Sequence, residues 1–384
     1  MSIFVDIHAI QTVPPSCINR DDTGSPKSAI YGGVHRHRVS SQSWKRATRL
    51  EFNKFLPEEK AGIRTKRIIE CVSAEIAKKR SDLAEEADKL AKAVFEAAGV
   101  KFEKIAKKKP ENNDDAAGET TLPKATYLWF LSRLQIEKLA DIAISSFDSS
   151  EKISAKSAKA AIKDMNSYDL ALFGRMVADD PNLNVDAACQ VAHAISTHCA
   201  EQEFDYFTAV DDVKSADPQA DAGAGMIGTV EFTSSTLYRY ATVSIDALAQ
   251  SLGCLESAYN AVTSFSQAFI TAMPTGKQNT FANRTLPEAV YITVRRHQPV
   301  SLVQAFEKPV TAKQEQGYSQ ESLKRLARYA RSLEDTYGIK PEYAFVLSLD
   351  DSVPEFNTLG EKITFTQLGD KIRAALESSS EVQQ

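Results

Sequence analysis

Hydrophobic and polar residues alternate over residues 2–11, SIFVDIHAIQ, and this alternation predicts a half-buried strand at the start of the chain. From about residue 57 to residue 109 the pattern becomes helical, with one apolar stripe between Lys-rich and Glu-rich faces: Leu83, Ala87, Leu90, Ala91 and Val94. Further helices are predicted at about 127–146 and 154–165. Residues 107–121 are polar and rich in helix breakers, which is typical of a connecting loop.

The second half of the chain contains both the alternation typical of strands and the spacing typical of helices. Alternating runs predict strands at 237–245, 290–295 and 343–349, and helical spacing predicts helices at 257–273, 322–337 and 364–377. Residues 185–198 fit neither period well. The order of these elements predicts an α+β fold in which a sheet domain carries a helical insertion. The order is a strand, a helix, a long helical stretch and then mixed strands and helices.

The composition is that of a globular protein, because 43% of the 384 residues are hydrophobic and 25% are charged. This length allows two domains, or one domain with a large insertion. No run of about 18 apolar residues occurs, and the first residues do not resemble a signal peptide. Five cysteines without the spacing of a disulfide framework indicate free thiols. We therefore expect a cytoplasmic protein with no membrane partner.

The segment from residue 31 to residue 49, YGGVHRHRVSSQSWKRATR, holds five Arg and Lys residues and no acid, in a chain of net charge −5. Ser40, Ser41 and Ser43 are N-cap residue types, so a helix is predicted to begin there. The helical period then separates two faces: Gln42, Lys45, Arg46 and Arg49 opposite Trp44, Ala47, Thr48 and Phe55. Free N–H groups at the helix start would suit a phosphate. A solvated surface helix is the alternative, but the missing acids favour contact with a polyanion.

Three patterns that suggest cofactor or metal chemistry fail in context. Gly223, Gly225 and Gly228 have the G-x-G-x-x-G spacing, but a strand-like run follows them where a dinucleotide site needs a helix. Zinc-ligand residue types occur without the usual paired Cys-x-x-Cys spacing: Cys189, His193, His198 and Cys199. Asp211 and Asp212 lack a third carboxylate at the spacing of a metal-dependent nuclease. We expect no cofactor and no metal.

Histidines near the basic segment leave one enzymatic alternative open. Metal-independent ribonucleases use histidine as acid and base near neutral pH, and His8, His35 and His37 are available here. No partner that would activate a nucleophile can be assigned to them. Two histidines within a basic segment more often supplement phosphate binding.

Several short segments of the sequence resemble segments of one known protein family. SCINRDD at 16–22, then Lys27, YGG at 31–33 and RVSSQSWKRATR at 38–49 resemble the start of the CasC-type backbone subunit of the type I-E CRISPR surveillance complex, Cascade. Further words follow in the family's order: FGRM at 173–176, AHAISTH at 192–198, DYFTAVDD at 205–212, IGTVEF at 227–232, LYRYATVSI at 237–245 and AFEKPV at 305–310. The chain departs from the family in about residues 55–165 and at His35 and His37, where basic residues are expected.

This resemblance implies an RRM-like (ferredoxin-like) palm formed by residues 1–56 and 181–384. It implies a helical finger inserted at 57–180 and a protruding thumb loop at about 201–232, and it makes much of 185–198 a strand. The implied function is not enzymatic: several copies multimerise along CRISPR guide RNA, join other Cascade subunits and present the spacer for pairing with target DNA in antiviral defence. A subunit that accepts any guide must grip the sugar-phosphate backbone and leave sequence to base pairing.

The resemblance also assigns roles to residues. Guide RNA would be bound by the basic face and its neighbours: Arg20, Lys27, Ser40, Gln42, Lys45, Arg46 and Arg49. Arg175 and Met176 are further candidates for RNA contact, and Met226 and Ile227 are the apolar residues available for a thumb wedge between bases. The alternative function is a metal-independent ribonuclease that processes CRISPR RNA.

Overall fold

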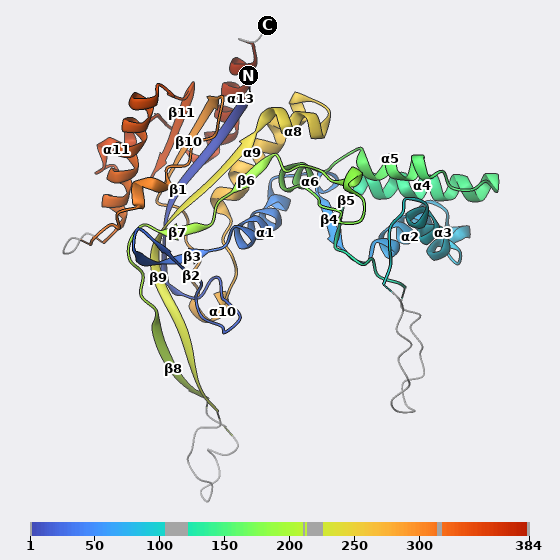
Figure 1. The fold of residues 1–384 in the computed structure, drawn as a ribbon, viewed down its shortest axis with the longest axis horizontal. Helices are drawn as coiled ribbons and strands as arrows, with labels where there is room; N and C mark the ends of the chain where they lie inside the picture. Colours follow the sequence, from blue (N-terminus) through green and yellow to red (C-terminus); the bar gives the residue numbers. More distant parts are fainter. Residues whose placement is uncertain (1, 104–121, 210–211, 213–225, 313–316, 382–384) are drawn as a thin grey trace, which may run out of the picture. The chain divides into compact units, whose positions relative to one another are not determined.

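The computed structural model describes residues 2–103, 122–209, 212, 226–312 and 317–381. Contacts divide the chain into two units, of which unit 1 comprises Met1–Phe55, Cys189–Ile245 and Val262–Gln384 (Figure 1). Unit 2 comprises Leu56–Ala188 and Asp246–Ala261. Unit 2 therefore includes residues 181–188 and 246–261 in addition to the stretch 57–180 that the sequence marks as an insertion.

Unit 1 is built on a large, mostly antiparallel sheet with the path β12-β11-β10-β1-β9-β7-β3-β2, and with β6 and β8 also paired to β9. Its strands are β1 (Ile3–Ser16), β2 (Ser28–Tyr31), β3 (Val34–Val39), β6 (Cys189–Val191), β7 (Ala194–Ser196), β8 (Glu203–Ala209), β9 (Met226–Ser244), β10 (Ala289–Arg296), β11 (Tyr343–Ser348) and β12 (Glu361–Lys362). The central strand β1 is flanked by β10 and β9, so that Ile7 lies opposite both Ile292 and Ala241. The α+β class predicted from the sequence is confirmed.

Helices cover both faces of this sheet (Figure 1). They are α1 (Ser41–Glu51), the later part of α9 (Leu255–Thr271), α10 (Gln278–Phe281), α11 (Ser319–Tyr337), α12 (Pro354–Asn357) and α13 (Leu368–Glu381). Helix α8 (Ile245–Leu252), except for Ile245, and the first part of α9 belong to unit 2. Leu323 and Leu326 of α11 pack in one core cluster with Ile10 of β1 and Tyr291 of β10. Residues two apart on a strand share a face, so Ile7 points to the opposite side of the sheet from Ile10.

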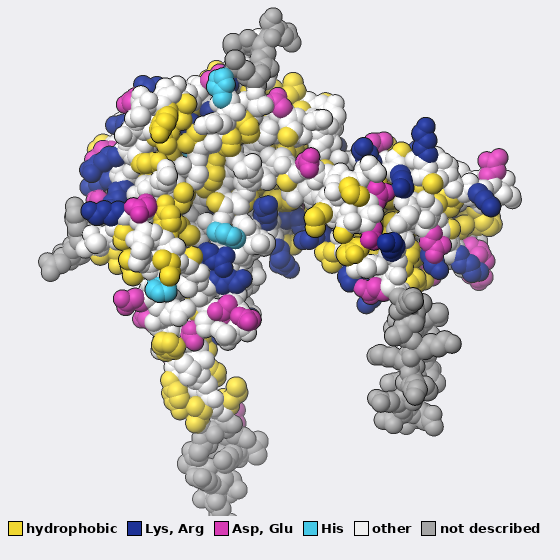
Figure 2. All heavy atoms as spheres, in the orientation of Figure 1, with side chains coloured by type: hydrophobic (Ala, Val, Ile, Leu, Met, Phe, Trp, Pro, Cys, Tyr) yellow, Lys and Arg dark blue, Asp and Glu magenta, His cyan; other side chains and the backbone are white. Residues whose placement is uncertain are grey.

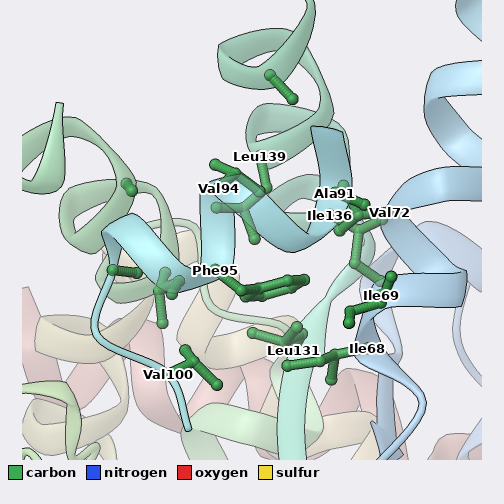
Figure 3. Close-up of a cluster of buried hydrophobic side chains, with 14 of the residues drawn as sticks. Ile68, Ile69, Val72, Ala91, Val94, Phe95, Val100, Leu131, Ile136 and Leu139 are labelled. Carbon is green, nitrogen blue, oxygen red and sulfur yellow. The ribbon is translucent and has the colours of Figure 1, made fainter. Parts of the chain in front are cut away.

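Unit 2 is mainly helical: α2 (Ile68–Lys79), α3 (Ala87–Ala97), α4 (Arg133–Ser149), α5 (Ala155–Lys163) and α6 (Tyr168–Phe173). Val72, Val94, Phe95 and Leu139, from three helices, meet in its core (Figure 3). The predicted apolar stripe is confirmed, since its members are buried or packed against this core.

A two-stranded sheet in unit 2, β4 (Gly62–Thr65) with β5 (Trp129–Ser132), was not predicted. The sequence favoured a helix from about residue 127, but the helix begins only after Ser132. There the Ser132 hydroxyl accepts from the N–H of Gln135, and the Gln135 side chain accepts from the N–H of Ser132. This capping box fixes the change from strand to helix.

Two predicted loops lie largely outside the described residues: the connector 107–121, and the tip of the thumb including Gly223 and Gly225. Within the described part of the chain, no helix has the length and apolar character needed to cross a membrane.

Candidate nucleic-acid interface

Helix α1 forms as the sequence predicts, with Ser40 as its N-cap. Trp44 and Thr48 are buried, Gln42 and Arg46 are exposed, and Lys45 and Arg49 are partly exposed. The first turn contains no acidic residue. One face of α1 therefore packs, and the opposite face presents cationic side chains to the surface.

The packed face is anchored by a buried cation. The Arg239 guanidinium of β9 lies 3.8 Å from the centre of the Trp44 ring, a cation–π contact. Its Nη1 donates to Oε1 of Gln11 at 2.6 Å, and Nη2 donates to the carbonyl of Phe269. Burial lowers the pKa of Arg239 to about 9, so the group is still charged near neutral pH. This contact holds α1 on the sheet.

Asn19 joins the preceding loop to the start of α1. Its side-chain oxygen accepts from the N–H of Ser40 at 2.8 Å, and its carbonyl accepts from the N–H of Lys27 at 2.9 Å. The Lys27 carbonyl in turn accepts from the N–H of Arg38 at 2.8 Å. These bonds bring Arg20 and Lys27, which are far from α1 in the sequence, into the neighbourhood of the helix.

The expectation of free N–H groups at the start of α1 is wrong for three of them. The N–H of Ser40 is bonded to Asn19, and the N–H of Ser41 donates to Nδ1 of His193 at 2.9 Å. The N–H of Ser43 donates to the hydroxyl of Ser40 at 3.3 Å, and Ser40 itself is buried. Attraction for an anion must therefore come mainly from side chains.

Three cationic side chains at or near α1 have no ion-pair partner in the described part of the chain. Among the described residues, no carboxylate forms an ion pair with Lys45, Arg46 or Lys27. Figure 2 shows Lys and Arg side chains gathered over α1 and the neighbouring strands of unit 1. This surface has the charge that a sugar-phosphate backbone requires.

A groove of about 570 Å³ runs beside this surface, between residues 18–24, α1 and residues 274–276. Arg20 and Arg46 line it together with Asp21 and Asp22, so its charges are mixed. Asp21 is engaged within its own loop, where Oδ1 accepts from the hydroxyl of Thr23 at 2.7 Å. The groove is therefore less suited to a polyanion than the Lys45 side of α1.

Arg36 belongs to the basic segment but lies in the interior. Its guanidinium donates to the carbonyls of Tyr31 (3.1 Å), Ser196 (2.9 Å), Phe306 (2.8 Å) and Glu307 (3.2 Å). Three of the segments that carry the family resemblance thus meet at the Arg36 side chain. They are residues 31–33, 192–198 and 305–310. The Cβ that a larger residue would have at Gly32 would lie 1.7 Å from the Glu307 carbonyl oxygen, so this approach also requires glycine.

The three candidate histidines occupy different environments. His8 is buried and stacks on Tyr240 with ring centres 5.0 Å apart. His37 is buried, with Nδ1 2.7 Å from the hydroxyl of Ser235, and burial lowers its pKa to about 4. His35 is exposed on the same strand. A role for His37 in phosphate binding is therefore excluded by its position, and only His35 lies at the surface.

Arg175 and Met176, in unit 2, differ in their exposure to solvent. Arg175 is buried, and its guanidinium donates to the carbonyls of Leu183 (3.0 Å), Phe130 (3.0 Å) and Ile162 (3.1 Å). These bonds use the donors that an RNA phosphate would need, which argues against the predicted contact by Arg175. The side chain of Met176 is 81% exposed and remains available.

The described part of the predicted thumb is a hairpin of β8 and β9, in register from Glu203 opposite Phe232 to Ala209 opposite Met226. Met226 and Ile227 are each 59% exposed. Phe204 and Tyr206 on β8 are exposed as well, and sequence reasoning missed them because a strand with two exposed faces has no apolar side to mark it. Figure 2 shows this apolar surface on the hairpin.

The zinc-ligand residue types serve other contacts. His193 bonds to α1, and Nε2 of His198 accepts from the N–H of Thr236 at 3.0 Å. Burial raises the pKa of Cys189 to about 12. The sequence analysis did not assign His193 to the surface at the start of α1. The only signal for such a role was the position of His193 within the segment AHAISTH, residues 192–198.

Known proteins share this architecture. A family model described as CT1975-like protein matches residues 5–371. A chain of a "CRISPR RNA-guided surveillance complex, pre-nicking" is 35% identical with a TM-score of 0.82, and the match covers 97% of this chain and 100% of that one. A chain of a "CRISPR RNA-guided surveillance complex" is 31% identical with a TM-score of 0.71, covering 97% and 99%. No curated protein matches the chain.

These matches extend over nearly the whole chain, including the basic segment and the hairpin. They confirm the resemblance to the CasC-type backbone subunit of Cascade that the sequence words indicated. The chain belongs to the CT1975-like protein family.

Proposed function

We propose that this protein is a non-enzymatic backbone subunit that binds guide RNA in a type I-E CRISPR surveillance complex in the cytoplasm. The observation that carries the proposal is the cationic face of α1, with Lys45, Arg46 and Arg49 opposite the anchored Trp44. The likeness to chains of RNA-guided surveillance complexes at 35% and 31% identity supports the same conclusion.

The proposed grip is independent of RNA sequence. Lys27, Lys45, Arg46 and Arg49 carry charges suited to phosphates, and Gln42 adds an exposed polar group. Phosphate contacts position a nucleic acid without reading its bases. Such a subunit accepts any guide and leaves the spacer bases free to pair with target DNA.

In this proposal unit 1 is the RRM-like palm, unit 2 is the helical finger, and the β8–β9 hairpin is the stem of the thumb. Several copies assemble along one guide RNA, together with other subunits of the complex. Met226 and Ile227, exposed at the described end of the hairpin, act as the apolar wedge between bases. Stacked bases are apolar on their faces, so insertion of such side chains is favourable.

A ribonuclease that processes CRISPR RNA is the second candidate. It would require two histidines, or a histidine and a partner, within reach of one phosphodiester. The burial of His8 and His37 supports the non-enzymatic proposal over this one, because His35 is the only one of the three candidate histidines that is exposed.

Coexpression with a guide RNA tests the proposal. Purified material should be a multimer that contains intact guide RNA, as measured by its mass in solution and by electrophoresis of the extracted RNA. A monomer without RNA would contradict the proposal. Discrete cleavage products that disappear in a His35→Gln variant would favour the ribonuclease.

A further inference from the structure

His193 lies beside the start of α1 because of the sheet register. Val39 of β3 pairs with Ala194 of β7, which places residue 193 next to the first residues of the helix. There Nδ1 of His193 accepts from the N–H of Ser41 at 2.9 Å. His193 is an exposed residue, so it bonds to the backbone through Nδ1 and still lies at the surface.

This hydrogen bond selects one tautomer of the ring. A nitrogen that accepts from an N–H carries no proton, so the neutral ring must hold its proton on Nε2. Partial burial and the positive charges of Arg38 and Lys27 lower the pKa of His193, which keeps the ring neutral near pH 7. In the described part of the chain, Nε2 has no hydrogen-bond acceptor.

Lys27, Arg38 and His193 thus place three donors close to the start of α1, two charged and one neutral. Resting on the proposed function, we propose that the Nε2–H of His193 donates a hydrogen bond to a phosphate oxygen of the guide RNA. The Ser41 N–H fixes the ring in the tautomer that can donate. His193 is then an RNA-binding residue that adds hydrogen bonding without adding charge.

A conservative substitution separates the two edges of the ring. In His193→Asn the amide oxygen can replace Nδ1 as acceptor for Ser41, but no donor remains at the position of Nε2. We expect unchanged thermal stability and an affinity for short single-stranded RNA of mixed sequence that is about tenfold weaker, as for one hydrogen bond to a charged group. The slope of log affinity against log salt should not change, because no charge is removed. Native affinity in this variant would overturn the inference.

Two further measurements keep the result interpretable. Imidazole ¹⁵N spectra of the native protein should show Nε2 protonated, with a resonance that shifts when RNA is added; an unshifted resonance would overturn the inference even if His193→Asn failed to fold. A Lys45→Ala, Arg49→Ala variant on the same RNA tests the proposed function separately. If that variant weakens binding and His193→Asn does not, only the role of His193 is wrong. If neither variant changes binding, the proposed surface itself is wrong.

Discussion

The side-chain oxygen of Asn19 accepts a hydrogen bond of 2.8 Å from the backbone N–H of Ser40, the residue that caps α1. The carbonyl of the same asparagine accepts from Lys27. One uncharged residue therefore links the loop that carries Arg20 and Lys27 to the first residues of the cationic helix.

Replacing Asn19 should weaken RNA binding without removing any charge. Asn19→Ala leaves the Ser40 N–H without its partner, at a cost of about 1–3 kcal/mol in the free energy of unfolding. The bond from Lys27 to the Asn19 carbonyl remains, but the loop that carries Lys27 loses its side-chain link to the start of α1, so affinity falls while the salt slope changes little. Denaturant unfolding and a salt series of RNA binding measure both effects. An affinity equal to that of the native protein would show that the loop does not contribute.

The basic face of α1 should dominate the salt dependence of binding. In a Lys45→Ala, Arg49→Ala variant, the slope of log affinity against log salt should become shallower by about 1.4, since each lost contact with single-stranded RNA contributes about 0.7. The matched control removes two exposed lysines of unit 2, Lys78→Ala and Lys89→Ala. A slope that stays the same in the α1 variant, with normal folding, would contradict the proposed surface.

The hairpin should act in assembly rather than in folding. Met226→Ser with Ile227→Ser changes only exposed side chains, so the free energy of unfolding should stay within about 0.5 kcal/mol of the native value. Multimers on guide RNA should become incomplete, as seen by electron microscopy and mass in solution. Leu349→Ser, at a side chain that is 80% exposed at the end of β11, is the control. Complete multimers in the hairpin variant would remove the wedge role.

Acid should destabilise the fold through His37. Its pKa is about 6.5 when unfolded and about 4 when folded. The stabilising contribution of the neutral ring is therefore complete above pH 6.5 and is lost as pH falls toward 4, by about 3 kcal/mol in total. His8 and His198 have lowered pKa values too, through burial, and act in the same direction.

The variant His37→Gln should show a weaker dependence of unfolding free energy on pH between 6.5 and 4. His35→Gln, at an exposed position of the same strand, is the matched control. If His37→Gln and the native protein lost stability in parallel on acidification, His37 would not be the group that titrates.

Arg36 should matter for stability far more than its neighbour Arg38. Lysine cannot serve four carbonyls with one ammonium group, so Arg36→Lys should lower the free energy of unfolding by about 3 kcal/mol or more. Arg38→Lys loses only one long bond of 3.4 Å to the Ser28 carbonyl and should be nearly neutral. Equal stability of the two variants in urea would refute the structural role of Arg36.

The sequence predicted the elements with a strong local period, and it failed where distant segments decide. The two faces of α1 follow from a spacing visible within eleven residues. The burial of Arg36 depends on carbonyls at Ser196 and Phe306, which no local pattern can reveal. The same holds for β5, whose partner β4 is more than sixty residues away in the chain. His193 was missed because only the β3–β7 register brings it to α1.

Strand β9 is continuous from Met226 to Ser244, and its partner changes from β8 to β1 near residue 233. Met226 stands at the exposed end, whereas Arg239 lies under Trp44 and α1. At about 3.3 Å per residue, these two points are roughly 40 Å apart along one hydrogen-bonded backbone. In a subunit that holds RNA at both places, this strand sets a fixed distance between the RNA contact at α1 and the RNA contact at Met226. A change in its length would alter the number of nucleotides between them, since no loop interrupts it to absorb the difference.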